Sequence, residues 1–222
     1  MFEKPIVMID FETTGLSPEM GERITEVAAL RIVGGRVVER YVSLINCKVR
    51  IPSFITGLTG ITQAMVDAAP PVAQVLPRLL EFIGSDALAA HNASFDEKFL
   101  YAESARLGMT PRHQGLVCSL KLSRRVFPGL ASYKLGMLSG QLGIQFRSAA
   151  HRAESDAEVA ARVLLHIGQH IGTTYGIAAV DAQLLEAVNR LSAAKVAQFL
   201  GKQALLVAHP APPPATPGPR MR

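Results

Sequence analysis

Tryptophan is absent from the sequence, and the only cysteines are Cys47 and Cys118, which form no Cys-x-x-Cys pair. Two isolated cysteines supply neither a disulfide framework nor a structural zinc site, so a reducing compartment is expected. The first residues also lack the basic and apolar segments of a secretory signal. No apolar run approaches the roughly 20 residues that a membrane-spanning helix needs. These absences together predict a cytoplasmic protein with no membrane span.

Charged residues are comparatively few, at 18% of the 222 residues, whereas 49% are hydrophobic. This balance excludes an intrinsically disordered chain and predicts a globular domain with a substantial core. The formal net charge is nevertheless +5, and the isoelectric point is about 9.5. A basic surface attracts polyanions over long range, so nucleic acid is a candidate partner.

Short apolar segments bounded by turn residues predict the strands of a mixed α/β sheet. The first segment is apolar throughout, as in a strand that is covered on both faces. Gly34 and Gly35 join two longer segments and predict a hairpin with a tight turn. The predicted strands are 6–9, 26–33, 37–45, 87–90 and 116–120.

Apolar residues at helical spacing predict helices packed on this sheet. Gly57 and Gly60 favour an irregular segment over 52–62, with a backbone that can approach a ligand. Segment 181–200 has the periodicity of one helix or a helix pair after the main domain. Segment 210–222 is rich in proline and alanine and is expected to be disordered. The predicted helices of the main domain are 71–83, 95–107, 121–127, 135–142 and 154–167.

Asp10 and Glu12 directly follow the apolar strand 6–9. Side chains alternate between the two faces of a strand, so both carboxylates project from one face while Phe11 points to the other. Two carboxylates at this spacing can hold one divalent cation between them. The alternative is a strand end that emerges into solvent, where acidic residues are common.

Asp96 lies near the start of the predicted helix 95–107. Ser94 and Glu97 have the spacing of a capping box, which places Asp96 in the first helical turn. An acid at this position complements the positive end of the helix dipole, which is the alternative to a ligand role. Asp96 nevertheless shares a helical stripe with apolar residues such as Phe99, so an inward-facing carboxylate is expected.

Asp156 begins a helical stripe that is otherwise apolar, which predicts that its side chain faces the core. The other members of the stripe are Val159, Ala160, Val163 and Ile167. His151 lies five residues earlier, which fits a position on the loop that enters the helix. A lone histidine is more often structural than catalytic, but three separate inward-facing acidic segments favour a catalytic role here.

Buried carboxylates repel one another and lose hydration, so a cluster of four persists only when cations neutralise it. Four acids and a histidine suit phosphodiester hydrolysis by two metal ions. The expected ligands are hard oxygens with no thiolate nearby, which favours Mg²⁺ or Mn²⁺. His151 would take a proton as general base, because histidine side chains titrate near neutral pH. The sequence therefore predicts a metal-dependent enzyme.

Three motifs, in order, carry a specific resemblance. They are Asp10-Phe-Glu-Thr-Thr-Gly-Leu, His91-Asn-Ala-Ser-Phe-Asp and His151-Arg-Ala-Glu-Ser-Asp-Ala. They resemble the exonuclease motifs of the DEDDh-type 3′–5′ exonuclease family, which includes the proofreading epsilon subunit of bacterial DNA polymerase III. The similarity runs from about Lys4 to about His170.

The resemblance implies a ribonuclease-H-like exonuclease fold of the α/β class. Its central five-stranded mixed sheet would be flanked by helices, with the second strand antiparallel. Together with the helical periodicity of 181–200 and the composition of the tail, this predicts an exonuclease domain over 1–172, a C-terminal helical extension over 173–208 and a disordered tail over 209–222.

The resemblance also implies a role for each active-site residue. Asp10 would bridge both metal ions, and Glu12 and Asp156 would hold the ion that carries the nucleophilic water. Asp96 would hold the other ion, and His151 would be the general base.

Further positions resemble family contacts to the 3′ end of the substrate. These positions are Thr13, Leu58, Thr59, Ile61, Asn92 and Phe95. Leu58 and Ile61 would wedge against bases, and Phe95 would offer a stacking surface. Core packing is the alternative for Leu58 and Phe95. Basic residues that could line the phosphate backbone, or simply form a solvated face, are Arg124, Arg125, Lys134, Arg147 and Arg152.

The predicted function is 3′→5′ hydrolysis of single-stranded or frayed DNA ends to 5′-mononucleotides, of proofreading or repair type. One alternative is an exoribonuclease that trims RNA 3′ ends, because the sequence does not reveal contacts to a 2′-hydroxyl. Another is a subunit that binds nucleic acid or a DNA polymerase through a vestigial site, against which the intact acidic set argues. Beyond residue 172, only Gln203-Ala-Leu-Leu-Val faintly resembles the clamp-binding peptide of polymerase-associated relatives.

Overall fold

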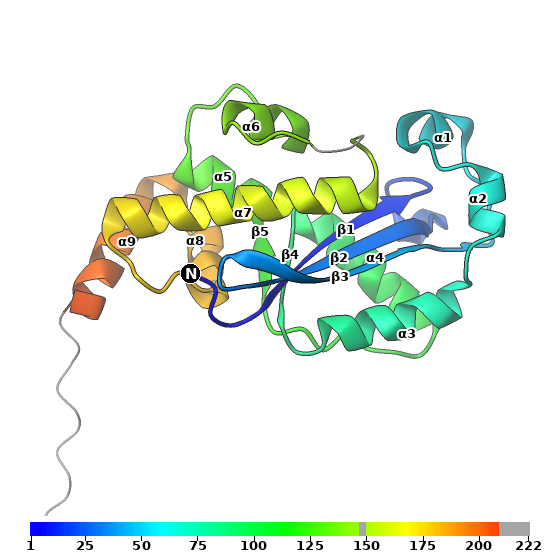
Figure 1. The fold of residues 1–222 in the computed structure, drawn as a ribbon, viewed down its shortest axis with the longest axis horizontal. Coiled ribbons are helices and arrows are strands. Elements are labelled where there is room, and N and C mark those ends of the chain that lie inside the picture. The colour runs from blue at the N-terminus through cyan, green and yellow to red at the C-terminus, as the bar shows by residue number, and fades with distance from the viewer. Residues whose placement is uncertain (147–149, 209–222) are drawn as a thin grey trace, which may run out of the picture.

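The computed structural model describes residues 1–146 and 150–208, so the predicted tail 210–222 and Arg147 lie outside the described residues. Its centre is a five-stranded sheet with the strand order β3-β2-β1-β4-β5 (Figure 1). β2 runs antiparallel to β1 and β3, while β4 is parallel to β1 and β5. This confirms the predicted mixed sheet with an antiparallel second strand. The strands are β1 (Ile6–Thr13), β2 (Ile24–Val33), β3 (Arg36–Leu44), β4 (Ala87–Ala90) and β5 (Leu116–Cys118).

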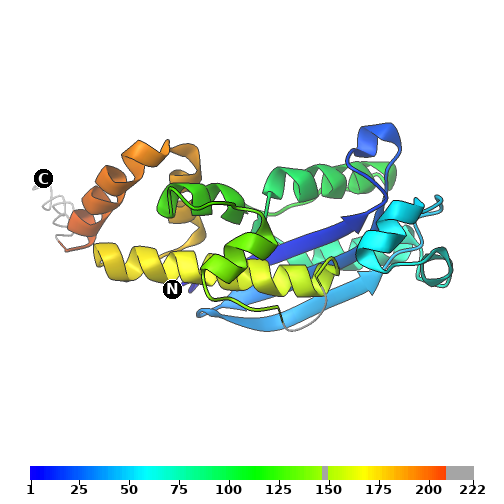
Figure 2. The same cartoon turned by 90° about the horizontal axis from the view of Figure 1, so that it is seen from above.

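Helices cover both faces of the sheet and give the domain three layers (Figures 1 and 2). The long helix α7 (Ala153–Tyr175) crosses one face, and α3 (Val72–Ile83) and α4 (Ala93–Arg106) pack on the other. The remaining helices are α1 (Ser53–Thr59), α2 (Gln63–Asp67), α5 (Ser119–Val126), α6 (Leu135–Gln141), α8 (Ala182–Arg190) and α9 (Ala193–Ala208), with a 3₁₀ turn at Pro18–Met20.

Strand β1 lies at the centre of the sheet and alternates between the two cores. Ile6 and Met8 belong to the core beneath α7, whereas Val7 and Ile9 belong to the core beneath α3 and α4. The strand continues past the predicted end at residue 9 as far as Thr13. Since side chains two residues apart share a face, the next two members of the α7-facing row are the acids at positions 10 and 12.

The predicted hairpin between β2 and β3 is confirmed. Gly34 and Gly35 have φ values of 58° and 79°, which side chains other than glycine rarely adopt. Two consecutive residues with positive φ make the tight turn whose twist matches that of the flanking strands.

The segment 52–62 is not irregular as predicted, because it contains α1 and leads directly into α2. Pro52 immediately precedes α1 with a φ of −59°, a value that its ring fixes and that suits a helix start. Gly60 ends the helix in the left-handed conformation with a φ of 72°. The glycines that suggested an irregular loop therefore lie inside and just after a short helix.

The predicted capping box at Ser94 and Glu97 is wrong. Helix α4 begins at Ala93, and the residue that precedes it is Asn92 in a left-handed conformation with a φ of 76°, without a side-chain cap. Asparagine is one of the few residues that tolerates this conformation. The chain thus turns sharply from β4 into α4, and Asp96 still lies in the first turn, as predicted.

The C-terminal helices share the core of the preceding domain. Helix α7 runs through the predicted boundary at residue 172 and ends at Tyr175. Asn189 of α8 pairs with the backbone of Cys118 at the edge of β5, with N···O distances of 2.8 and 3.1 Å. Apolar residues that α8, α9 and their connections add to the core beneath α7 are Ile177, Val180, Leu185, Val188, Val196 and Leu200. Within the described ranges, no helix has the length and apolar character needed to cross a bilayer.

Candidate active site

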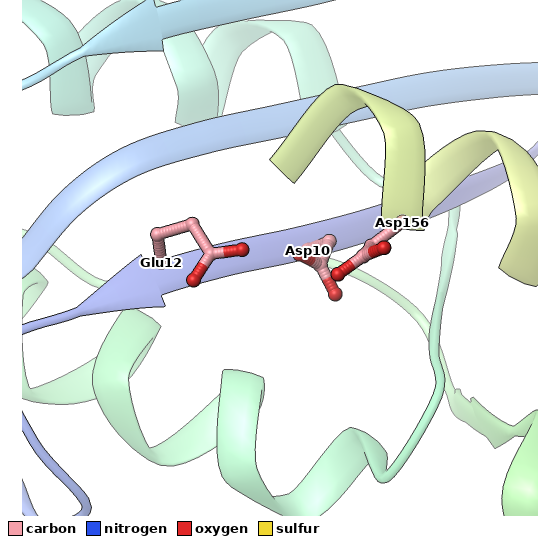
Figure 3. Close-up of side chains that lie close together, drawn as sticks. All are labelled: Asp10, Glu12 and Asp156. Atoms are coloured by element: carbon pink, nitrogen blue, oxygen red, sulfur yellow. The ribbon is translucent and has the colours of Figure 1, made fainter. Parts of the chain in front are cut away.

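Three carboxylates converge where β1 meets the start of α7. Asp10 and Glu12 project from β1 toward α7, and Asp156 approaches from the first turn of that helix (Figure 3). One oxygen from each lies within 4.8 Å of the other two. Asp156 lies 146 residues after Asp10 and 144 after Glu12 in the chain, so the packing of α7 on the sheet must create this cluster.

Asp96 stands apart from this group of three. Its side chain is only 3% exposed, and its Oδ1 accepts a hydrogen bond of 3.2 Å from the backbone N–H of Phe11. Its charge still acts on Asp10, whose pKa it helps to raise. The four predicted ligands therefore form a cluster of three carboxylates with a fourth, buried carboxylate beside Asp10.

The pKa of each of the four acids is raised. For Asp10 the cause is first the loss of hydration and then the charges of Asp96 and Asp156. Loss of hydration also dominates at Glu12, where it and the charge of Asp156 raise the pKa to about 8. Burial likewise raises the pKa of Asp96 and of Asp156. Such a cluster resists ionisation until a cation compensates its charge.

His151 lies on the loop immediately before α7, as predicted from its spacing. Its φ is 61°, a left-handed conformation, and its side chain is exposed. The backbone N–H of His151 donates to Oδ2 of Asp156 at 3.2 Å. The charge of the imidazole also opposes the rise in the pKa of Asp156. The imidazole is thus near the carboxylate cluster yet accessible to solvent.

A fifth acid at the site, Glu26 on β2, was not predicted from the sequence. Glu26 is directly opposite Glu12 in the β1–β2 pairing and is 3% exposed. Its carboxylate forms a bidentate ion pair with the guanidinium of Arg152, with N···O distances of 2.6 and 3.1 Å. The available signal was the same as for Asp10: Glu26 shares a strand face with the buried Ala28 and Leu30.

Three residues predicted to contact substrate have side chains that are at least partly accessible to solvent. Leu58 on α1 is 51% exposed, and Asn92 is exposed at the turn into α4. Phe95 is half-buried and packs at a tilt on Phe99, with ring centroids 5.1 Å apart. Leu58 and Asn92 are thus exposed to solvent, whereas Phe95 is partly buried against the core beneath α3 and α4.

The other three have side chains that are occupied within the protein. The Thr13 hydroxyl donates to the carbonyl of Gly15 at 2.6 Å, and the buried Thr59 hydroxyl donates to the carbonyl of Ile55 at 2.9 Å. Ile61 is completely buried in a small core beneath α1 and α2. The Ile61 side chain therefore packs in the core and does not present a wedge to a base.

The basic residues proposed to line the phosphate path divide into two groups. Arg125 donates to the carbonyl of Leu191 at 2.6 Å and so fastens α5 to the C-terminal helices. Arg152 is engaged with Glu26. Arg124 and Lys134 are exposed, and Arg124 lies over the ring of Tyr133 at 5.8 Å. Among the described members of this basic set, only Arg124 and Lys134 therefore have side chains available to contact phosphates.

The chemistry of the donor set fits a divalent metal ion. Asp10, Glu12 and Asp156 offer hard oxygen ligands, which Mg²⁺ and Mn²⁺ prefer. Metal binding requires these carboxylates to be ionised, and their raised pKa values show that ionisation is unfavourable without a cation. The site is therefore built to bind cationic charge.

The raised pKa values predict a pH-dependent stability in the absence of metal. Between the ordinary glutamate pKa of 4.5 and the value of about 8 for Glu12, the folded protein binds more protons than the unfolded chain. Stability therefore falls as pH rises through this window. We expect the melting temperature of metal-free protein to be lower at pH 8 than at pH 5.5, and Mn²⁺ to raise it more at pH 8.

Differential scanning fluorimetry with EDTA or with Mn²⁺ at both pH values measures this effect. Asp67→Asn, which alters an exposed aspartate on α2, is the control and should respond to Mn²⁺ as the unmodified protein does. An increase in melting temperature that is the same at both pH values would contradict the assigned cause.

A ribonuclease-H-like sheet with carboxylates toward the end of its first strand is the arrangement expected of an exonuclease domain. The chain belongs to the exonuclease family, because the family model RNase_T, described as Exonuclease, matches residues 7–164.

Curated relatives agree with this assignment. The DNA polymerase III subunit epsilon of Aquifex aeolicus is 36% identical over 179 residues, which cover 80% of this chain and 87% of that protein. The 3′-5′ exonuclease DinG of Bacillus subtilis is 38% identical over 75% of this chain and 18% of that protein. The PolC-type DNA polymerase III of Clostridium perfringens is 36% identical over 73% of this chain. The chain spans only 11% of that polymerase.

Solved structures show the same fold. Exonuclease X, in complex with 5′ overhanging duplex DNA, is 27% identical and has a TM-score of 0.65 over 83% of this chain and 99% of that one. The nuclease domain of 3′hExo, a DEDDh family member bound to rAMP, has a TM-score of 0.66 at 22% identity, over 76% of this chain and 93% of that one. At that identity the second likeness shows the fold alone.

Proposed function

We propose that this chain is a divalent-metal-dependent 3′→5′ exonuclease that degrades DNA from its 3′ end to 5′-mononucleotides by a two-metal mechanism. The observation that carries the proposal is the convergence of Asp10, Glu12 and Asp156 beside His151. The relatives support DNA as the substrate class, since those matched include a DNA polymerase subunit and a nuclease solved with DNA.

Each active-site residue has a chemical task in this proposal. Asp10, Glu12 and Asp156 would hold one divalent ion, and Asp10 together with Asp96 would hold a second. Divalent ions bound there would supply charge stabilisation for the phosphate and lower the pKa of water. An imidazole nitrogen of His151 accepts the proton of the attacking water, a task for which its solvent-accessible position beside Asp156 suits it.

The substrate end would lie against residues whose side chains are at least partly accessible to solvent. Leu58, Asn92 and Phe95 would contact the terminal nucleotides, with Phe95 offering a ring face to a base. Arg124 and Lys134 would attract the phosphate backbone. Contact with Thr13 and Thr59 would use backbone groups, because both hydroxyls are bonded within the protein.

Matched DNA and RNA oligonucleotides, labelled at either end, test polarity and substrate class together. With Mn²⁺ or Mg²⁺, we expect 5′-labelled DNA to give a ladder of progressively shorter products and 3′-labelled DNA to release labelled mononucleotide at once. We expect RNA to be cut more slowly by about tenfold or more, because excluding one added hydroxyl has an effect on the order of 10–100-fold.

The protein should be purified from a nuclease-deficient host, and EDTA should stop all cleavage. Release of mononucleotide from the 5′ end would contradict the polarity. Faster digestion of RNA than of DNA would replace the proposed substrate with the exoribonuclease alternative. Binding of DNA without cleavage in either metal would support a non-catalytic binding subunit instead.

A further inference from the structure

Glu26 is a buried acid at the site that has no place among the proposed metal ligands. It lies on the α7-facing side of β2, directly across from Glu12. A carboxylate so close to Glu12 and Asp156 adds to the repulsion there, and its charge raises the pKa of both. An uncompensated charge in this position would be costly.

Three hydrogen bonds tie Glu26 to the beginning of α7. Its Oε1 accepts from Nη2 of Arg152 at 2.6 Å, and its Oε2 accepts from Nε of the same side chain at 3.1 Å. Oε2 also accepts from the backbone N–H of Ala153 at 2.9 Å. The first N–H groups of a helix lack partners within the helix, and Arg152 at the N-cap makes no side-chain capping bond. Glu26 therefore caps α7 from a different element of the fold.

This cap fixes the backbone that carries two active-site residues. His151 directly precedes Arg152, and its own N–H is held by Asp156 from within the helix. The segment 151–153 is thus held by a carboxylate of the helix on one side and by a carboxylate of the sheet on the other. The position of Asp156 relative to Asp10 and Glu12 then depends on how firmly the start of α7 is attached to the sheet.

We propose that Glu26, through Arg152 and Ala153, is a positioning residue that sets Asp156 and His151 against the two acids of β1. The inference rests on the proposed metal-dependent nuclease function. Arg152 neutralises Glu26, so the Glu26 carboxylate holds the helix and does not compete for cations. Some residues orient metal ligands without touching the metal. Mutation of such a residue commonly lowers metal affinity or activity by about 10–100-fold.

A variant of Glu26 is expected to fold, because other contacts also attach α7 to the sheet. Arg40 of β3 pairs with Glu154 and Glu158 of α7 at 3.2 and 2.5 Å, so the first turns of the helix keep a second attachment to the sheet. Glu103 provides a matched control pair: its carboxylate is 1% exposed and accepts two hydrogen bonds from Arg23 at 2.6 and 2.8 Å. That pair joins α4 to the segment before β2 and does not touch α7.

The experiment compares Glu26→Gln, Arg152→Lys and Glu103→Gln in the full chain. Glutamine has nearly the shape of glutamate, but its amide N–H₂ would face the donors of Arg152. Lysine keeps the charge of Arg152 but loses the parallel pair of donors. Mn²⁺ affinity is measured without nucleic acid from the electron paramagnetic resonance signal of free Mn²⁺. The kcat and KM are measured on 5′-labelled DNA, and melting temperatures are recorded for all variants.

We expect Glu26→Gln to weaken Mn²⁺ binding by about tenfold and to lower kcat by about 10–100-fold, with KM for DNA changed less than about threefold. Arg152→Lys should give a smaller loss of both. Glu103→Gln should lower the melting temperature but leave Mn²⁺ affinity and kcat unchanged. A merely structural role for Glu26 would give the Glu103→Gln pattern, which would overturn the proposal.

The failures of the two proposals are distinguishable. If the unmodified protein neither binds Mn²⁺ nor cleaves DNA, the proposed function fails. If the unmodified protein does both and folded Glu26→Gln matches it, only the positioning role fails. Should Glu26→Gln not fold, Arg152→Lys decides the question, because the Arg152 side chain is 40% exposed and its replacement tests the same attachment. If Arg152→Lys then has the same Mn²⁺ affinity and kcat as the unmodified protein, the proposal is overturned.

Discussion

Replacing Asp10 with asparagine should abolish nuclease activity and, at neutral to alkaline pH, make the metal-free protein more stable. Asp10 is flanked by Glu12 and Asp156 in the cluster and is also affected by the charge of Asp96. The amide keeps the size of the side chain but removes the negative charge that would bind metal. Because metal ions contribute several kcal/mol to such reactions, we expect a loss of at least ~10³-fold in rate.

The gain in stability follows from the sign of the pKa shift at Asp10. A raised pKa means that the folded protein disfavours the ionised form, so the ionised carboxylate destabilises the fold once the pH exceeds the ordinary aspartate pKa. Asparagine carries no charge at any of these pH values. The melting temperature of metal-free Asp10→Asn should therefore exceed that of the unmodified protein at pH 8, and the difference should shrink toward pH 5.

Activity assays with Mn²⁺ and melting curves in EDTA measure the two effects on the same preparations. Asp67→Asn, at an exposed position on α2, should retain both the activity and the stability of the unmodified protein. Retained nuclease activity in Asp10→Asn would eliminate the metal-binding role of the cluster. A lower melting temperature at pH 8 would instead show that the carboxylate stabilises the fold, contrary to its raised pKa.

Period-two alternation was enough to locate the acids of β1 from the sequence. Ile6 and Met8 face the core beneath α7, and Asp10 and Glu12 continue that row. Helical spacing with Val159 and Val163 likewise predicted that Asp156 lies on the inner face of its helix. The antiparallel second strand came from the resemblance to a family, and the strand order was not predicted, because pairing between distant segments leaves no local signal in one sequence.

Interactions between distant residues account for what the sequence did not reveal. Glu26 and Arg152 are 126 residues apart in the chain. Their contact forms only when α7 packs on the sheet, so neither residue indicates it in the sequence. Arg152 consequently resembled one more phosphate contact. Local rules also failed where two signals competed: Gly57 suggested a loop, yet Pro52 and the left-handed Gly60 define a short helix between them.

The second large effect is expected at His151, whose removal should reduce the rate without weakening metal binding. His151 contacts Asp156 through its backbone N–H, so a change of side chain leaves that contact in place. A positioned general base typically contributes about 10²–10⁴-fold to a rate. We expect His151→Asn and His151→Gly to lose kcat in that range, while Mn²⁺ affinity without nucleic acid changes little.

These two substitutions suit the left-handed backbone of residue 151, because asparagine and glycine both tolerate its φ of 61°. Glycine also leaves space for a small base, so added imidazole should restore part of the activity of His151→Gly but not that of Asp10→Asn. His166→Gln, farther along the same helix, should behave as the unmodified protein. This pattern differs from that expected for Glu26→Gln, in which Mn²⁺ affinity falls together with kcat. Unaltered kcat in both His151 variants would require another group to accept the proton.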